Sequence, residues 1–182
     1  MTGQQSASAF ASTGPIVLIG AGNMGGALLT GWLKNGVPGS SVIVVDPNPS
    51  EPMRKMIEDA GASHVIGVPA GVTAGVLFVA VKPQVMDAVL PPLKAAVGTD
   101  TVVVSIAAGK TLASLEKHLG EAAMVRAMPN TPAMVGRGVT GAFANARVGE
   151  RQRQLVQNLL KVSGPVEWVP GEADIDSVTA VS

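Results

Sequence analysis

A short apolar run, Ile16 to Ile19, passes directly into the glycine pattern G-x-G-x-x-G at residues 20 to 25. In this pattern Gly20 permits a tight turn off a strand, Gly22 lets backbone N–H groups approach a bound group without a Cβ, and Gly25 lets a helix pack closely on a sheet. The helix N-terminus adds partial positive charge and unpaired N–H donors. The pattern therefore predicts a strand, a phosphate-binding turn and a helix in immediate succession.

The residues that follow extend this unit. Ala27 to Asn35 predict a helix that ends at Gly36, and residues 42–45 predict a second strand that ends at Asp46. Asp46 follows Gly25 by about 20 positions, the spacing at which a carboxylate accepts a hydrogen bond from the adenosine ribose of a dinucleotide. The β-α-β unit predicts a dinucleotide site, and the alternative is a glycine turn in some other α/β protein.

The composition fits one domain that binds a small ligand. The chain has 182 residues, of which 47% are hydrophobic, enough for one domain with a core but not for two full domains. Only 14% of the residues are charged and the formal net charge is zero, which excludes the electrostatic footprint of a nucleic-acid or anionic-lipid binder. No apolar run reaches the length of a membrane span, so no membrane partner is expected.

The chain contains no cysteine. This excludes disulfides, thiol nucleophiles and thiolate metal sites, and it fits a reducing cytoplasm, where we expect the protein to be located. The histidines, His64 and His118, are each expected to have a structural role, and no metal site is expected because neither has cysteine or carboxylate companions in the sequence. Any redox chemistry must come from a bound cofactor.

Apolar patterns and turn residues predict alternating strands and helices along the rest of the chain. A helix at 84–97 must kink or divide at Pro91 and Pro92. The alternation predicts an α/β fold of the Rossmann type, a doubly wound, mainly parallel sheet with helices on both faces. The remaining strands are expected at 64–66, 76–81, 101–106, 124–128, 139–144 and 166–169, and the remaining helices at 51–60, 112–119 and 150–162.

Ligands of such sheets lie outside the carboxyl ends of the strands, so the segments that follow the strands are expected to form one rim. Residues 1–14 have no periodicity and are expected to be a disordered leader. Residues 15–170 are expected to form the NAD(P)-binding domain. The rim segments are 20–24, 46–48, 80–83, 106–109 and 128–131.

Four of these segments carry a family resemblance. They read GAGNMG at 20–25, AVKP at 80–83, SIAAG at 105–109 and RAMPNTP at 126–132. In this order and spacing the chain, from about Ile16 onward, resembles the pyrroline-5-carboxylate reductases. The resemblance implies transfer of a hydride from NADPH or NADH to C5 of 1-pyrroline-5-carboxylate, which gives L-proline. No catalytic side chain is assigned, because the cofactor carries the difficult step.

The resemblance also implies which residues contact the cofactor. Its pyrophosphate is held by the glycine turn, its adenosine ribose by the end of the second strand, and its middle and its nicotinamide end by the two following rim segments. In that order the residues are Ile19, Gly20, Ala21, Gly22, Asn23 and Met24; then Asp46, Pro47 and Asn48; then Ala80, Val81, Lys82 and Pro83; and then Ile106, Ala107 and Ala108.

Two departures from the family pattern are expected to matter. Gly67 stands where family members often have a cofactor-contacting asparagine, so that contact is not assigned. Family members also continue past the segment that matches 176–182 with a helical domain that makes the dimer. Residues 171–182 would then be the start of a linker to this missing domain. The parent is expected to be a homodimer or higher homo-oligomer, this chain monomeric, and the chain alone to bind cofactor weakly and turn over little or nothing.

Several readings stay open at this level. Lys82 is a pocket-rim residue or a solvated lysine, Asn130 orients the nicotinamide or caps a turn, and Arg126 faces an anion or a carboxylate. Asp46 favours NADH because its charge repels a 2′-phosphate, although Asn48, Ser50 and Arg54 could surround one. The alternative functions are another dinucleotide oxidoreductase, of the β-hydroxyacid dehydrogenase or F420 type, and a non-catalytic nucleotide-binding regulator.

Overall fold

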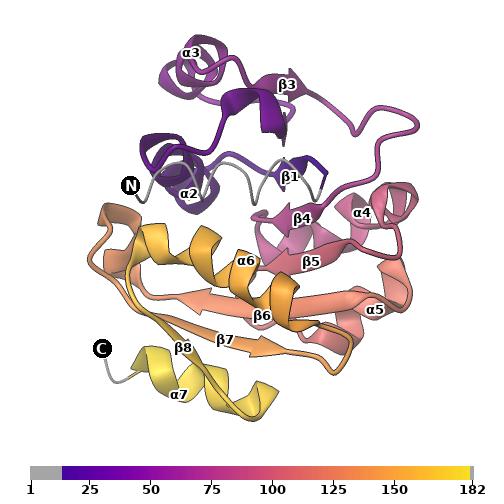
Figure 1. Cartoon of the computed structure of the whole chain (residues 1–182), viewed down its shortest axis with the longest axis vertical. Coiled ribbons are helices and arrows are strands. Elements are labelled where there is room, and N and C mark those ends of the chain that lie inside the picture. Colours follow the sequence, from indigo (N-terminus) through magenta and orange to yellow (C-terminus); the bar gives the residue numbers. More distant parts are fainter. Residues whose placement is uncertain (1–13, 181–182) are drawn as a thin grey trace.

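The computed structural model describes residues 14–180, and all but Gly14 of the predicted leader lies outside this range. Its centre is an eight-stranded sheet in the order β3-β2-β1-β4-β5-β6-β7-β8. Figure 1 shows the strands following one another down the molecule, from β3 near the top to β7 and β8 below. The strands are β1 (Ile16–Ile19), β2 (Val42–Val45), β3 (Ser63–Val65), β4 (Val76–Val79), β5 (Val102–Ser105), β6 (Ala123–Pro129), β7 (Thr140–Ala144) and β8 (Val166–Trp168).

The first six strands are parallel and lie in the order 3-2-1-4-5-6, the order of the Rossmann fold. The predicted doubly wound, mainly parallel sheet is thus confirmed. Strand β7 runs antiparallel to β6, and β8 runs parallel to β7. The order reverses between β1 and β4, the position at which sheets of this kind bind their ligands.

Helices cover both faces of the sheet (Figure 1). Helices α2, α3 and α6 bury their apolar side chains in one cluster with half of the strand residues, whereas α4 and α5 share the other cluster. The α-helices are α2 (Asn23–Lys34), α3 (Glu51–Asp59), α4 (Met86–Val89), α5 (Leu112–Leu119), α6 (Glu150–Leu160) and α7 (Ile175–Ala180). The described residues also contain six short 3₁₀ turns, namely η1 (Gly39–Ser41), η2 (Pro83–Val85), η3 (Pro91–Ala96), η4 (Thr131–Val135), η5 (Lys161–Ser163) and η6 (Glu172–Asp174).

Alternate residues of the central strands supply the two halves of the core. On β1, Leu18 belongs to the cluster under α2 and α6, and Val17 to the cluster under α4 and α5. Trp32 of α2 is fully buried and meets Phe78 of β4 edge to face, with ring centroids 5.2 Å apart. Its indole N–H donates to the carbonyl oxygen of Leu159 at 2.8 Å, which fixes α2 against α6.

Three elements differ from the expectations, and a fourth divides as expected. Helix α2 begins at Asn23 rather than Ala27, because its first turn continues directly from the glycine turn. The segment at 84–97 divides into η2, α4 and η3, as its two prolines required. Strand β7 returns from β6 through η4 without a crossover helix, so the two strands are antiparallel. The segment expected to begin a linker contains α7, which packs on β6 and β7.

Candidate functional site

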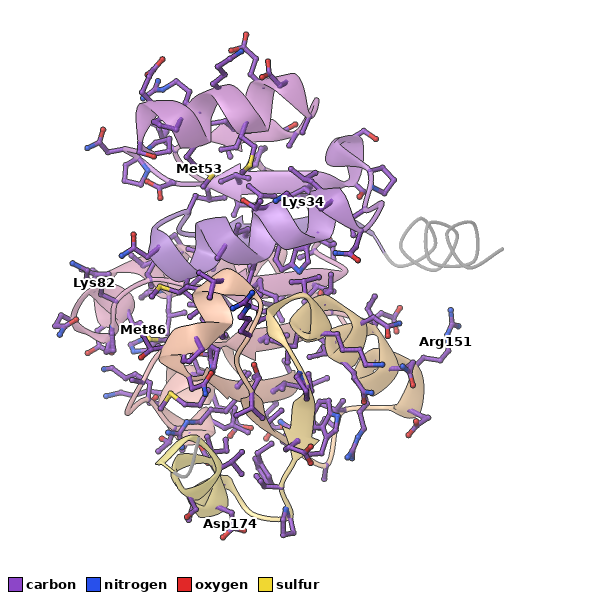
Figure 2. All side chains as sticks on the ribbon, turned by 90° about the vertical axis from the view of Figure 1, so that its left-hand side faces the viewer. Lys34, Met53, Lys82, Met86, Arg151 and Asp174 are labelled. Carbon is purple, nitrogen blue, oxygen red and sulfur yellow. The ribbon has the colours of Figure 1, made fainter. Side chains whose placement is uncertain are left out.

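A cleft opens between the N-terminal end of α2 and the turn that joins β2 to α3. Its volume is about 500 Å³, and it lies beside the reversal of strand order at β1. Figure 2 shows Met53 between the ribbons of α3 and α2. The lining residues are Ala21, Gly22, Asn23, Gly26, Ala27, Thr30, Asp46, Asn48, Pro49, Ser50 and Met53.

The glycine turn is tightly packed at its two outer positions. Gly20 has a φ of +90°, and a Cβ added there would lie 2.8 Å from the carbonyl oxygen of Ala80. An added Cβ at Gly25 would collide with the carbonyl oxygen of Gly20 and lie 3.1 Å from Cβ of Ala80. The packing of the turn against β4 and α2 therefore requires glycine at both positions.

Gly22 differs from both. No atom lies within 4 Å of a Cβ added there, and its φ of −71° is accessible to any residue. Gly22 is the N-cap of α2, no side chain caps this helix end, and its first turn has no acidic residue. The N–H groups of the first turn thus face the cleft beside a residue with no side chain, an arrangement that accepts an anion.

Asp46 braces this turn from the end of β2. The backbone N–H of Ala21 donates to Oδ2 of Asp46 at 2.7 Å, and the N–H of Asn48 donates to Oδ1 at 2.8 Å. The Nε2 of His64 lies 2.8 Å from the carbonyl oxygen of Asp46, which gives this histidine the structural role expected for it. The carboxylate predicted to meet a ribose therefore also holds together the two walls of the cleft.

The other predicted segments lie along the same rim but do not line the cleft. Backbone hydrogen bonds continue the parallel ladder past the strand ends. The N–H of Ala80 donates to the carbonyl oxygen of Ile19 at 2.8 Å, and the N–H of Ile106 donates to the carbonyl oxygen of Val79 at 3.1 Å. Residues 80–83 and 106–108 therefore lie next to one another beyond the ends of β4 and β5. Lys82 is exposed at the margin of the molecule (Figure 2).

The structure gives partners to two residues whose roles the sequence left open. Oδ1 of Asn130 accepts the N–H of Val139 at 3.0 Å, so this side chain holds the turn between β6 and β7. Arg126 faces a carboxylate, with its Nη1 atom 3.7 Å from Oε1 of Glu172.

Five residues of the cleft were not predicted: Gly26, Ala27, Thr30, Pro49 and Met53; Ser50 was named only as a residue that could surround a 2′-phosphate. A sequence signal existed for three of them. Gly26, Ala27 and Thr30 follow Asn23 at helical spacing and share its face of α2. Nothing local marks Met53, which meets the cleft because its methyl group packs where a side chain at Gly26 would lie.

A small charged cluster joins α4, the loop before α5 and α5 itself. Oδ1 of Asp87 lies 3.0 Å from Nε2 of His118, and Oδ2 lies 3.6 Å from Nζ of Lys110. The His118 hydrogen bond, aided by the charge of Lys110, holds the pKa of the Asp87 carboxyl below its ordinary value of 3.8. The sequence did not reveal this carboxylate companion of His118.

The cluster predicts a pH-dependent contribution to stability. Since the folded-state pKa of Asp87 is lowered, its carboxylate stabilises the fold above pH 3.8 and loses this effect as the pH falls through the folded value. We expect Asp87→Asn to lower the urea midpoint at pH 7 and to match the parent chain at pH 2. The loss at pH 7 should shrink when His118→Gln is already present, and an equal loss at both pH values would contradict the assignment.

Two further features of the described residues, 14–180, bear on other functions. No group of three or more His, Cys, Asp or Glu side chains in this range could hold a metal ion. None of the helices in the same range has the length and apolar character needed to cross a membrane.

Known proteins resemble this chain over most of its length. Residues 15–109 match a family described as NADP oxidoreductase coenzyme F420-dependent. The chain is 41% identical over 174 residues to the pyrroline-5-carboxylate reductase of Pseudomonas aeruginosa, covering 94% of this chain and 63% of that protein. It is 40% identical to the Haemophilus influenzae enzyme of the same name, covering 92% of this chain and 62% of that protein. The chain thus spans less than two thirds of the length of these relatives.

Solved structures of proteins with similar names are also similar to this chain. The pyrroline-5-carboxylate reductase of Coxiella burnetii superposes with a TM-score of 0.85 at 34% identity, over 94% of this chain and 64% of that one. The Plasmodium falciparum pyrroline carboxylate reductase, solved with NADP bound, superposes with a TM-score of 0.77 at 24% identity, over 92% of this chain and 62% of that one. The second likeness supports the fold.

Proposed function

The chain belongs to the NADP oxidoreductase, coenzyme F420-dependent family, and from this premise we propose that residues 15–170 form the NAD(P)H-binding domain of a pyrroline-5-carboxylate reductase. The substrate is taken from the relatives named above, which share this activity in their names. The proposal covers the reduction of 1-pyrroline-5-carboxylate to L-proline by the whole protein, of which this chain supplies the cofactor domain.

The cleft at the N-terminus of α2 is the observation that carries the cofactor part of the proposal. It combines a helix end without a side-chain cap, a glycine whose missing Cβ would occupy open space, and a bracing carboxylate at the end of β2. A pyrophosphate needs N–H donors and close backbone approach, and this turn offers both. The residues present therefore fit a dinucleotide.

The bound nicotinamide would supply the hydride that reduces C5 of the imine. The chain's own residues would place the cofactor: 19–24 at the pyrophosphate, 46–48 at the adenosine ribose, 80–83 at the middle and 106–108 at the nicotinamide end. Small side chains at Ala107 and Ala108 leave room for the ring. Orientation is the main contribution that such a domain makes, because the cofactor carries the reacting bond.

We expect this chain to bind NAD(P)H and to reduce 1-pyrroline-5-carboxylate slowly or not at all. The reason is that it covers only 63% and 62% of the two relatives' lengths, which leaves more than a third of each without a counterpart here. Calorimetry with each nucleotide measures binding, and NAD(P)H oxidation with the imine measures turnover. Absence of binding to either nucleotide would overturn the proposal, and near-normal proline formation would contradict the expected need for further residues.

The choice between NADPH and NADH depends on the ribose end of the cleft. Asp46 lies there and directs both of its carboxylate oxygens to backbone N–H groups. Asn48 and Ser50 line the same cleft, and Arg54 lies one turn into α3, 3.8 Å from Glu51 through its Nε atom. We propose that these residues leave room for either cofactor, a point that the ratio of the two dissociation constants decides.

The family's description favours one rival function, an oxidoreductase that uses coenzyme F420. It would share the glycine turn but reject the imine. Incubating the complete protein with NADPH and either 1-pyrroline-5-carboxylate or oxidised F420 separates the two functions, because only one acceptor should be reduced. We further propose that the complete protein is a homo-oligomer in the cytoplasm and that this chain alone is monomeric, which size-exclusion chromatography of both forms tests.

A further inference from the structure

Glu172 is far in sequence from the residues that line the cleft, but its side chain contacts a segment next to the rim. It begins η6, three residues before α7, and its side chain is 26% exposed. Helix α7 packs on β6 and β7, and a Cβ added at Gly141 would lie 3.3 Å from the carbonyl oxygen of Ile175. The turn that carries Glu172 is therefore held closely against the sheet.

Glu172 binds the first residue of α5. The N–H of Leu112 donates to Oε1 of Glu172 at 2.8 Å. Thr111, the N-cap, accepts the N–H of Ser114 through its hydroxyl at 3.3 Å. A carboxylate at this end of a helix meets both an unpaired donor and the positive end of the dipole. The start of α5 is thus fixed by a residue 60 positions later in the chain.

The same carboxylate oxygen faces a buried cation. Nη1 of Arg126 lies 3.7 Å from Oε1 of Glu172, and the arginine side chain is only 6% exposed. On the sheet Arg126 is paired with Ser105, the last residue of β5. Burying a guanidinium is costly unless a well-placed carboxylate lies close enough to compensate its charge. Arg126 therefore helps to hold Glu172 at the point where β5 ends and its loop begins.

These contacts frame the loop at 106–111, which joins β5 to α5. At its start, Ile106 N–H donates to Val79 at 3.1 Å and Ala107 N–H lies 3.3 Å from Oγ of Ser105. At its end, Leu112 is held by Glu172. Between them Ala108 and Gly109 are exposed. The loop is fixed at both ends and open in the middle, where the ring would lie.

We propose that Glu172 is a positioning residue for the nicotinamide end of the cofactor. This inference rests on the proposed function, since it takes residues 106–108 as the nicotinamide contact. Glu172 touches neither cofactor nor substrate; by holding Leu112 it sets where the loop presents Ala107 and Ala108. The segment that leads into α7 is thereby coupled to the part of the site where the hydride would be transferred.

The test compares nucleotides with and without the ring, using the 182-residue chain. The dissociation constant of NADPH or NADH, whichever binds more tightly, is compared with that of its counterpart lacking nicotinamide, 2′-phospho-ADP-ribose or ADP-ribose. In Glu172→Ala we expect the ratio of the two affinities, which measures the advantage of the ring-containing nucleotide, to fall about fivefold, the effect of one lost hydrogen bond. The affinity for the counterpart without the ring should change little. Amide exchange at Leu112 should become faster in the same variant.

Two variants serve as matched controls. Glu172→Gln keeps an acceptor oxygen for Leu112 and should retain the advantage of the ring within about twofold. Asp174→Asn removes the same charge from the same turn, at an exposed residue labelled in Figure 2, and should leave both readouts unchanged. If Glu172→Ala fails to fold, Glu172→Asp withdraws the carboxylate by one methylene and should give a smaller loss of the same kind.

Each other outcome overturns the inference. Equal weakening of both nucleotides would mean that Glu172 only stabilises the fold. An unchanged ratio of the two dissociation constants in Glu172→Ala would mean that Glu172 does not position the loop. The same result in Glu172→Asp has this meaning where the alanine variant does not fold. Equal binding of both nucleotides by the parent chain would also overturn the inference. A loss of the ratio in Glu172→Gln with Leu112 still protected would exclude the hydrogen bond as the cause. If the parent chain binds no nucleotide, the proposed function fails first, and that result is distinct from all the others.

Discussion

A Gly22→Ala variant is expected to fold as the parent chain does and to lose most of its affinity for NAD(P)H. The backbone there has an ordinary φ, and an added Cβ meets no protein atom within 4 Å. We expect the free energy of unfolding to change by less than about 1 kcal/mol, since a weaker N-cap and a less flexible unfolded chain act in opposite directions. The new methyl group would occupy the approach to the N–H donors of α2, and nucleotide binding should weaken about 10- to 100-fold.

Gly25→Ala provides the contrast. Its Cβ would collide with the backbone of Gly20, which cannot move without displacing β1, so we expect a loss of about 2 to 4 kcal/mol in stability. Urea unfolding and calorimetric titration of both variants measure the two effects. Full nucleotide affinity in a folded Gly22→Ala chain would show that the phosphates bind elsewhere.

Asp46→Ala is expected to damage both the fold and the cleft. Its carboxylate accepts the N–H groups of Ala21 and Asn48, and Ala21 is buried. Leaving a buried N–H without a partner costs about 1 to 3 kcal/mol, so the midpoint of unfolding should fall measurably. Because the two walls of the cleft then separate, the affinities for NADH and NADPH should both decrease.

Asp46→Asn separates the hydrogen bonds from the charge. Asparagine keeps one acceptor oxygen, so we expect about half of the stability loss, and it removes the charge that repels a 2′-phosphate. The ratio of NADPH to NADH affinity should therefore rise by a few-fold even as both affinities fall. Asp59→Asn is the control, since that carboxylate pairs with Lys55 at 3.0 Å, at the other end of α3. An unchanged ratio in Asp46→Asn would remove Asp46 from cofactor selection.

Much of the fold could be predicted because its signals are local. Buried parallel strands are continuous apolar runs; the expected strand at 42–45 matches β2, and the one expected at 76–81 contains β4, which ends two residues earlier. The expected helix at 112–119 agrees with α5, whose ends are marked by Thr111 and Gly120. The direction of β7 had no such signal, since the length of apolar strands says nothing about which way the chain returns.

The candidate site, like the fold, could be predicted in part. Glycines that must pack closely are visible in the sequence, and so was the acid at the end of β2. Three contacts were not visible, namely Asp46 with Ala21, Arg126 with Glu172 and Asp87 with His118, because each joins residues that are 25 or more positions apart and depends on how the elements pack. The roles of residues 80–83 and 106–108 in binding stay predictions, since their positions on the rim are now known but not their contacts with a nucleotide.

The hydrogen bond from Trp32 to Leu159 has a consequence for how the protein is made. It spans 127 positions and joins the helix whose N-terminus faces the cleft to the helix α6 near the other end of the described chain. The first β-α-β unit looks complete in the sequence once Asp46 has been passed. During translation, however, this unit acquires its final support only after the ribosome has released residues well beyond 150.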